Sequence, residues 1–164
     1  MNIHEAIKFL DKQISNPSLG LPEEVFLFIS QTTPIVNVDL LIKDENGQTL
    51  LSWRNDPFHG VGWHIPGGII RFKEKLERRI QKVAEIEIGA PVEFDPDPIA
   101  INQLIAPKRN TRGHFISILY KCSLPSKYIP GNKGLSNKDN GYLMWHDSCP
   151  ENLIKVHEIY RKYI

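Results

Sequence analysis

The sequence has few cysteines, no excess charge of either sign and no long apolar run. Its 164 residues include 2 cysteines, which excludes a disulfide framework or a metal-binding cysteine pair, and a reduced, cytoplasmic setting is expected. Lys and Arg number 20 against 19 Asp and Glu, so a protein that coats nucleic acid or an anionic membrane is disfavoured. Apolar stretches such as 25–29 and 35–42 are too short to span a bilayer, and residues 1–5 do not resemble a signal peptide. No nucleic-acid partner and no membrane partner are expected.

The length suits a single domain, and the spacing of apolar residues changes along it from helical to extended. Residues 3–14 place apolar side chains at a helical period, and a second short helix is expected at 22–30. We therefore expect a helical N-terminal extension over residues 1–31 and a main domain over residues 32–164.

Within the main domain, strands are expected to alternate with a few helices. One helix is expected over residues 73–88 and another from Pro150, while residues 123–141 form a long irregular loop that is functional or mobile. The expected strands cover residues 35–42, 49–54, 63–66, 99–105, 114–122 and 142–145. This order predicts an α/β or α+β domain, in which helices pack on a mixed sheet.

Glu87 stands out because it lies on a helical face that is expected to be buried. At about 100° per residue, it falls within the apolar stripe of Leu76 and Ile80. A carboxylate there must be paired, protonated or bound to a cation, unless the last turn frays and exposes it to water. The upstream pair Gly67–Gly68 is either a tight turn with positive φ or the source of a backbone carbonyl. A carbonyl and a carboxylate together suit a hard cation such as Mg²⁺.

The segment around these residues resembles the Nudix box of Nudix hydrolases. The box is a glycine, five residues, a glutamate and seven residues, followed by Arg-Glu, Glu-Glu and a final glycine at fixed spacing. The positions that fit are Gly68, Glu74, Glu87, Gly89 and Ala90. Those that depart are Lys82 for the arginine, and Val83 and Ile86 for two glutamates. The resemblance implies a Nudix-type α/β/α sandwich whose cation site retains one of its usual carboxylates.

A similarly reduced box occurs in the GDP-mannose mannosyl hydrolases, a branch of the Nudix hydrolases. The chain is similar to that branch over residues 32–95 and more weakly to about residue 147, including segment 33–39 and the spacing from Arg54 to Trp63. In that branch, water attacks the anomeric carbon of the sugar and releases GDP with inversion. The resemblance implies the same reaction here, with a GDP-mannose-like nucleotide sugar as substrate. It also implies one Mg²⁺ ion, with Mn²⁺ as an alternative, and a homodimer.

The resemblance assigns roles to individual residues. The Gly67 carbonyl and the Glu87 carboxylate match metal ligands. Asp39 matches an aspartate that contacts the sugar, and Arg54 matches an arginine near the diphosphate that takes part in catalysis. Lys82 keeps the positive charge of the box arginine without its bidentate guanidinium, and it too is predicted to be catalytic.

Other positions differ from the branch. The arginine after its second glycine is Ile69 here, and its Gln-His pair, a metal ligand and general base, falls on Asp139 and Asn140 in one of the possible loop alignments. Asp139 is predicted to bind the metal or accept a proton, which Asn140 cannot do. Arg109, in a basic loop, is predicted to bind substrate and replace the missing charge, although such charge runs are often solvated. His64 is expected to be a packed or surface histidine rather than a catalytic one.

Two other functions stay open at this point. A pyrophosphatase would cut the phosphoanhydride of a nucleoside diphosphate derivative, using metal ligands from elsewhere in the chain. A nucleotide-binding domain without catalytic activity would account for the residues Ile69, Val83, Ile86 and Asn140.

Overall fold

The computed structural model describes residues 2–164, and an eight-stranded mixed sheet forms its centre. The strands are β1 (Ile35–Lys43), β2 (Thr49–Asp56), β3 (Gly60–His64), β4 (Gly67–Ile69), β5 (Glu93–Phe94), β6 (Ala100–Ile105), β7 (His114–Ser123) and β8 (Leu143–His146). Their main order is β3-β2-β1-β7-β5, with β4 paired to β1, β6 to β7 and β8 to β2. The long pair β1 and β7 is parallel, and the other strand pairings are antiparallel.

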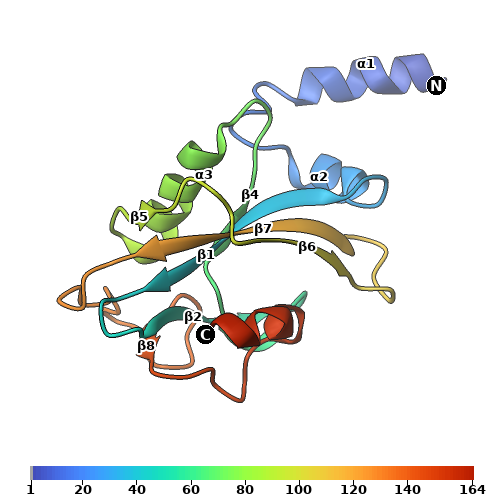
Figure 1. The fold of residues 1–164 in the computed structure, drawn as a ribbon. Helices are drawn as coiled ribbons and strands as arrows, with labels where there is room; N and C mark the ends of the chain where they lie inside the picture. Colours follow the sequence, from blue (N-terminus) through green and yellow to red (C-terminus); the bar gives the residue numbers. More distant parts are fainter. Residues whose placement is uncertain (1) are drawn as a thin grey trace.

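Helices pack on both faces of this sheet (Figure 1). The α3 helix (Leu76–Val83) and the π-helical turn η1 (Ala84–Ile88) lie on one face, and the 3₁₀ helix η2 (Lys155–Tyr163) lies on the other. The C-terminal helix expected from Pro150 therefore begins later and has the tighter 3₁₀ geometry. The predicted mixed sheet between helical layers is confirmed. No helix within residues 2–164 is long and apolar enough to cross a membrane.

Alternation along β1 produces a separate core on each face of the sheet. Leu40 and Ile42 are fully buried in the same cluster as Ile80 of α3. The intervening Leu41 belongs to a second cluster that contains Tyr160 of η2. Successive strand residues point to opposite faces, so polar residues of β1 at odd positions face the C-terminal layer.

Two helices precede the sheet, as the sequence predicts. The α1 helix (Ile3–Gln13) begins with a capping box, in which Asn2 and Glu5 each accept a hydrogen bond from the other's backbone N–H. The α2 helix (Glu23–Ile29) follows Pro22, whose fixed φ suits a helix start. In Figure 1, α1 projects away from the sheet, whereas α2 lies beside it. A functional boundary between residues 31 and 32 stays a prediction.

The single α-helix predicted over residues 73–88 is wrong at both ends. Lys73 has a φ of 57°, which a right-handed helix does not accommodate, and the helix starts at Leu76 instead. At the other end, the Gly89 N–H donates to the carbonyl of Ala84, five residues earlier, at 2.9 Å. This wider turn displaces the last helical residues from α-helical register, and it carries Glu87.

The glycine pair Gly67–Gly68 lies in β4 and neither glycine has a positive φ, so the tight turn considered for this position does not form. Both glycines are required by close packing instead. A Cβ on Gly67 would collide with Oδ1 of Asp39, the residue opposite it on β1. A Cβ on Gly68 would lie 2.6 Å from Cγ2 of Val83. The absence of side chains therefore lets β4 pack between β1 and α3.

Candidate functional site

Two adjoining cavities open beside the sheet, and Arg54 and His64 line both of them. The larger cavity, of about 570 Å³, is also lined by Glu87 of η1 and by residues of the long loop before β8. The smaller cavity, of about 250 Å³, is lined by Asp39 of β1 and Gly67 of β4. A ligand that reaches both Glu87 and Asp39 must therefore pass the Arg54–His64 pair.

His64 is buried, as expected for a packed histidine, but its ring also connects two charged groups of the site. Nδ1 lies 2.7 Å from the Ser52 carbonyl, which can only accept, so Nδ1 carries the hydrogen and donates it. Nε2 is left as an acceptor for Nη2 of Arg54 at 3.1 Å, and it lies 3.6 Å from Oε2 of Glu87. Nη1 of Arg54 lies 3.3 Å from Oδ2 of Asp56. The position of Arg54 is thus fixed from two sides.

Glu87 is the carboxylate of the site that is free to meet a cation. A quarter of its side chain is exposed, and its Oε2 lies 3.6 Å from Nε2 of His64. Within residues 2–164, no three Asp, Glu, His or Cys side chains gather into a complete metal site. Mg²⁺ in phosphate-binding sites commonly takes one or two carboxylates and completes its shell with water and substrate oxygens. The residues therefore fit a cation that is held jointly with a substrate.

Asp39 is buried and held by donors from three elements. Its Oδ1 accepts a hydrogen bond from Nδ2 of Asn37 at 2.7 Å. Its Oδ2 accepts from the hydroxyl groups of Ser117 in β7 and Tyr160 in η2, the latter at 2.6 Å. Burial raises the pKa of Asp39, and the two hydroxyl donors oppose this rise. Burial also raises the pKa of Tyr160, so its hydroxyl stays a donor to the carboxylate.

Glu74 is committed to a buried ion pair. Its Oε2 accepts from both Nε and Nη2 of Arg79 at 2.7 Å and from the Arg71 backbone N–H at 2.9 Å. Both side chains of the pair are about nine-tenths buried. This pair fixes the loop between β4 and α3, and all three donors contact the same carboxylate oxygen of Glu74.

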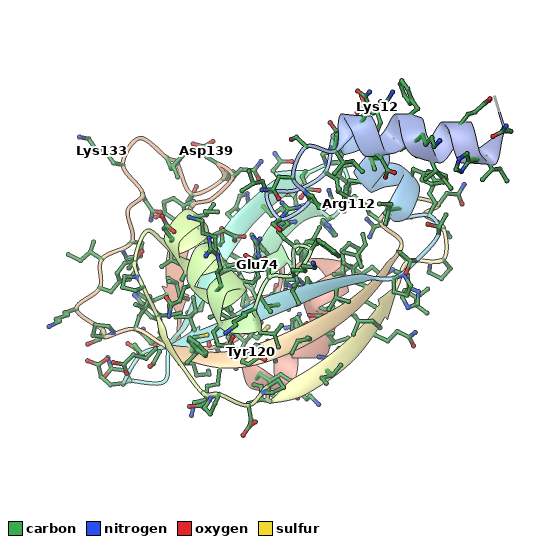
Figure 2. All side chains as sticks on the ribbon, turned by 90° about the horizontal axis from the view of Figure 1, so that it is seen from above. Lys12, Glu74, Arg112, Tyr120, Lys133 and Asp139 are labelled. Atoms are coloured by element: carbon green, nitrogen blue, oxygen red, sulfur yellow. The ribbon has the colours of Figure 1, made fainter. Side chains whose placement is uncertain are left out.

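Three residues with predicted roles line neither cavity: Lys82, Asp139 and Arg109. Lys82 is on the solvent-exposed face of α3 and pairs with Glu85 at 2.8 Å. Asp139 lies in an exposed turn, where the Ser136 N–H donates to its carboxylate at 2.7 Å and lowers its pKa. Its neighbour Asn140 lines the larger cavity instead. Figure 2 shows Asp139 on its loop, well apart from Glu74. The catalytic and metal-binding roles of Lys82 and Asp139 stay predictions.

Sequence reasoning missed the partners of Asp39 and the place of Arg71 in the smaller cavity. Tyr160 is 121 residues from Asp39 in the sequence, and no motif marks it. Arg71, two residues after Ile69, lines the smaller cavity, and Arg112 of the loop before β7 lines it too. Arg112 belongs to the same basic loop as Arg109 and lines the cavity, whereas Arg109 is not among the lining residues.

No family model matches the chain, and curated relatives resemble about half of it. The chain is 32% identical over 83 residues to the low-salt glycan biosynthesis protein Agl8 of Haloferax volcanii, covering 51% of this chain and 53% of that protein. It is 30% identical over 87 residues to an ADP-ribose pyrophosphatase of Methanocaldococcus jannaschii, covering 53% and 49%. The chain thus spans about half the length of the curated relatives it matches.

Solved structures give a likeness over more of the chain. A MutT Nudix hydrolase from Burkholderia pseudomallei superposes with a TM-score of 0.65 at 21% identity, covering 80% of this chain and 98% of that one. A structure described as a possible asymmetric diadenosine tetraphosphate hydrolase, from Jonesia denitrificans, has a TM-score of 0.59 at 19% identity, with coverages of 80% and 92%. The chain therefore has the fold of the Nudix hydrolases.

Proposed function

We propose that this protein is a Nudix-type hydrolase that cleaves a nucleotide sugar of the GDP-mannose kind with the help of a divalent cation. Water would attack the anomeric carbon of the sugar, so that the glycosidic C–O bond breaks and the nucleoside diphosphate leaves. The similarity of the segment from Asp39 to Glu87 to the GDP-mannose mannosyl hydrolases supports this reaction. The relative in glycan biosynthesis, whose matched segment covers 53% of its length, agrees with a sugar substrate.

The observation that carries the proposal is the position of Arg54 between the two cavities. Arg54 and His64 line both cavities, Glu87 lines the larger and Asp39 the smaller. A diphosphate beside Arg54 and Glu87 would leave its sugar within reach of Asp39, whose carboxylate accepts hydrogen bonds and is held in one orientation. Binding the diphosphate and the sugar on opposite sides of one arginine suits cleavage between them.

A cation held by Glu87 and the Gly67 carbonyl, when bound, would neutralise the negative charge of the departing diphosphate. The chain's own residues supply the remaining charge. Arg54 offers a planar guanidinium that matches phosphate oxygens. The arginine that follows the second glycine in the related branch is Ile69 here, but Arg71 lines the same cavity two residues further along. Although Ile69 carries no charge, Arg71 in the loop after β4 therefore gives this cavity a cationic side chain.

The decisive experiment identifies the products formed from GDP-mannose with Mg²⁺. GDP and free mannose are expected, whereas GMP and mannose 1-phosphate would contradict attack at carbon. In water enriched with ¹⁸O, the label should enter mannose and not GDP, because the sugar carbon receives the attacking oxygen. Binding of nucleotide sugars without any turnover would leave a nucleotide-binding domain as the function.

A phosphoanhydride hydrolase is the second candidate, and the ADP-ribose pyrophosphatase among the relatives favours it. The same assay with ADP-ribose separates the two, because phosphoanhydride cleavage yields AMP and ribose 5-phosphate.

A homodimer, implied by the family resemblance, is also proposed. Light scattering during size-exclusion chromatography should give twice the mass of the 18.8 kDa chain.

A further inference from the structure

Four arginines line the smaller cavity, and one of them has no anionic partner and no part in the proposed function. Arg54 and Arg79 are held by carboxylates at 3.3 Å and 2.7 Å. Arg71 has a place in the proposed function, because it adds positive charge on the side of the departing diphosphate. The guanidinium of Arg112 makes no hydrogen bond and no ion pair with residues 2–164. Arg112 is therefore a cation of the cavity whose partner is still to be assigned.

Contacts with the N-terminal segment and with the loop after β2 hold Arg112 in place. Oγ of Ser30 accepts the Arg112 backbone N–H at 3.0 Å. The guanidinium carbon lies 4.7 Å from the ring centre of Phe58 and 5.7 Å from that of Phe26 in α2. Figure 2 shows Arg112 beside this helix. Aromatic faces orient a guanidinium without neutralising it, so Arg112 keeps its charge for another partner.

The charged groups around Arg112 leave one positive charge uncompensated. Asp56 and Glu23 act on Arg112 as negative charges, and Arg54 and Arg109 act on it as positive charges. Three guanidinium groups, with Arg112 included, therefore oppose two carboxylates. An anion with a single charge would balance this group, whereas a group with two charges would exceed the balance.

Three buried nitrogens of this cluster lack a hydrogen-bond partner in the part of the chain that the structure describes: Nε of Arg112, Nη1 of Arg109 and Nδ1 of His59. Burial and the positive charge of Arg54 lower the pKa of His59 to about 4, so its ring is neutral near pH 7 and donates one hydrogen bond. Buried polar groups are normally paired. Because His59 and Arg112 both line the smaller cavity, a ligand there can supply the missing acceptor.

The smaller cavity has a size that suits a single sugar ring. Its volume is about 250 Å³, which is below the usual range for pockets that hold larger ligands. In the proposed function the sugar lies here, within reach of Asp39, while the diphosphate lies beside Arg54 and Glu87. A sugar that fills the cavity meets Arg112 as well as Asp39, because both line it. A hydroxyl group offers a guanidinium one acceptor atom, whereas a carboxylate accepts two parallel N–H bonds.

We propose that the sugar of the substrate carries a carboxylate, as in a nucleotide-linked uronic acid, and that Arg112 and His59 bind this carboxylate in the smaller cavity. The inference rests on the proposed function for the place of the sugar, and it specifies the class of sugar, which the resemblance does not give. It also gives the N-terminal segment a role in selecting the sugar, because Ser30 and Phe26 position Arg112.

The test compares GDP-mannose with GDP-mannuronic acid, in which a carboxylate replaces the CH₂OH group of the sugar. Wild-type protein with Mg²⁺ should hydrolyse GDP-mannuronic acid with a kcat/KM about tenfold higher, because a charge-assisted pair replaces a neutral contact. Arg112→Gln should bring the ratio of the two kcat/KM values to about one. Arg78→Gln, at an exposed position of α3, changes the net charge equally and should keep the wild-type ratio.

A second variant covers the case in which Arg112→Gln does not fold. His59→Leu should lower the ratio about threefold, because it removes one neutral hydrogen bond to the carboxylate and leaves the charge of Arg112. The ratio compares two substrates on the same protein, so a partial loss of folded protein does not change it.

The outcomes separate this inference from the proposed function. Equal kcat/KM values in wild type, or a preference for GDP-mannose, would overturn the acidic sugar and leave hydrolysis of a nucleotide sugar standing. The wild-type ratio in Arg112→Gln would overturn the assignment to Arg112. If neither substrate is hydrolysed, the proposed function fails, and isothermal titration with the two nucleotide sugars decides this inference. Tighter binding of GDP-mannuronic acid to wild type, but not to Arg112→Gln, would support it, and equal binding would overturn it.

Discussion

Nη2 of Arg54 lies 3.1 Å from Nε2 of His64, and both residues of this contact line both cavities. The opposite nitrogen, Nη1, lies 3.3 Å from Oδ2 of Asp56. A planar guanidinium held at two nitrogens keeps one orientation, so its remaining N–H groups meet a substrate without reorganisation. Neighbouring groups thus set the direction of the Arg54 donors as well as the charge of the site.

Arg54→Lys should lower kcat/KM for the nucleotide sugar about tenfold, although the charge is unchanged. A lysine ammonium cannot contact the imidazole and the carboxylate while also presenting a two-pronged face to phosphate. Steady-state kinetics of the variant test this, with Arg78→Lys on the exposed side of α3 as the control. Activity of Arg54→Lys equal to that of wild type would mean that charge alone matters at this position.

Glu87→Gln should raise the Mg²⁺ concentration needed for half-maximal activity about tenfold or more, because the amide is a poorer ligand for a hard cation. The control is Glu85→Gln in the same helical turn, where the side chain is exposed and pairs with Lys82. Mg²⁺ titrations of hydrolysis by the three proteins give the comparison. An unchanged Mg²⁺ requirement in Glu87→Gln would remove Glu87 from the proposed cation site.

The parts of the fold that depend on local spacing could be predicted from the sequence. The helices near residues 3–13 and 23–29 follow from apolar periodicity and from Pro22, and the β1–β2 hairpin follows from its apolar runs and the turn at Gly47. The Nudix resemblance predicted Glu87 as a metal ligand, and the structure places it beside a cavity, on a π-helical turn that has no sequence signal. The spacing of apolar residues predicts where a helix lies. It does not predict a change from α-helical to π-helical hydrogen bonding within that helix.

The contacts that orient the site join distant segments, which is why the sequence did not reveal them. Tyr160 reaches Asp39 only because η2 folds back over the sheet. The partner of Glu74 is Arg79, which is buried, whereas Lys82, three residues later, is exposed and pairs with Glu85. Asn140 faces the larger cavity while Asp139 does not, which depends on the path of an irregular loop.

Glu74→Gln should lower the free energy of unfolding by about 3 kcal/mol, because it leaves the buried Arg79 guanidinium without its counter-charge. Urea unfolding followed by tryptophan fluorescence measures the change. Glu85→Gln breaks a solvent-exposed ion pair and should cost about 0.5 kcal/mol or less. Similar losses in the two variants would show that burial does not distinguish these pairs.

Asp39→Asn should become more stable relative to wild type as the pH rises from about 4 to about 7. Burial raises the pKa of Asp39 in the folded state, so the folded protein binds this proton more tightly than the unfolded chain does. The stability contributed by protonated Asp39 is complete below the unfolded pKa and is lost as the pH rises through the raised folded pKa. Asparagine has no such loss, and its amide oxygen can still accept from Tyr160.

Urea unfolding of both proteins at several pH values within this window measures the difference in the free energy of unfolding. Asp56→Asn provides a control of opposite sign. Although burial raises the pKa of Asp56, hydrogen bonds from the backbone N–H groups of His59 and Phe58 lower it overall. Wild type should therefore lose its advantage over Asp56→Asn as the pH falls, not as it rises. If Asp39→Asn instead lost stability relative to wild type toward neutral pH, the hydroxyl groups of Ser117 and Tyr160 would outweigh the cost of burying the charge.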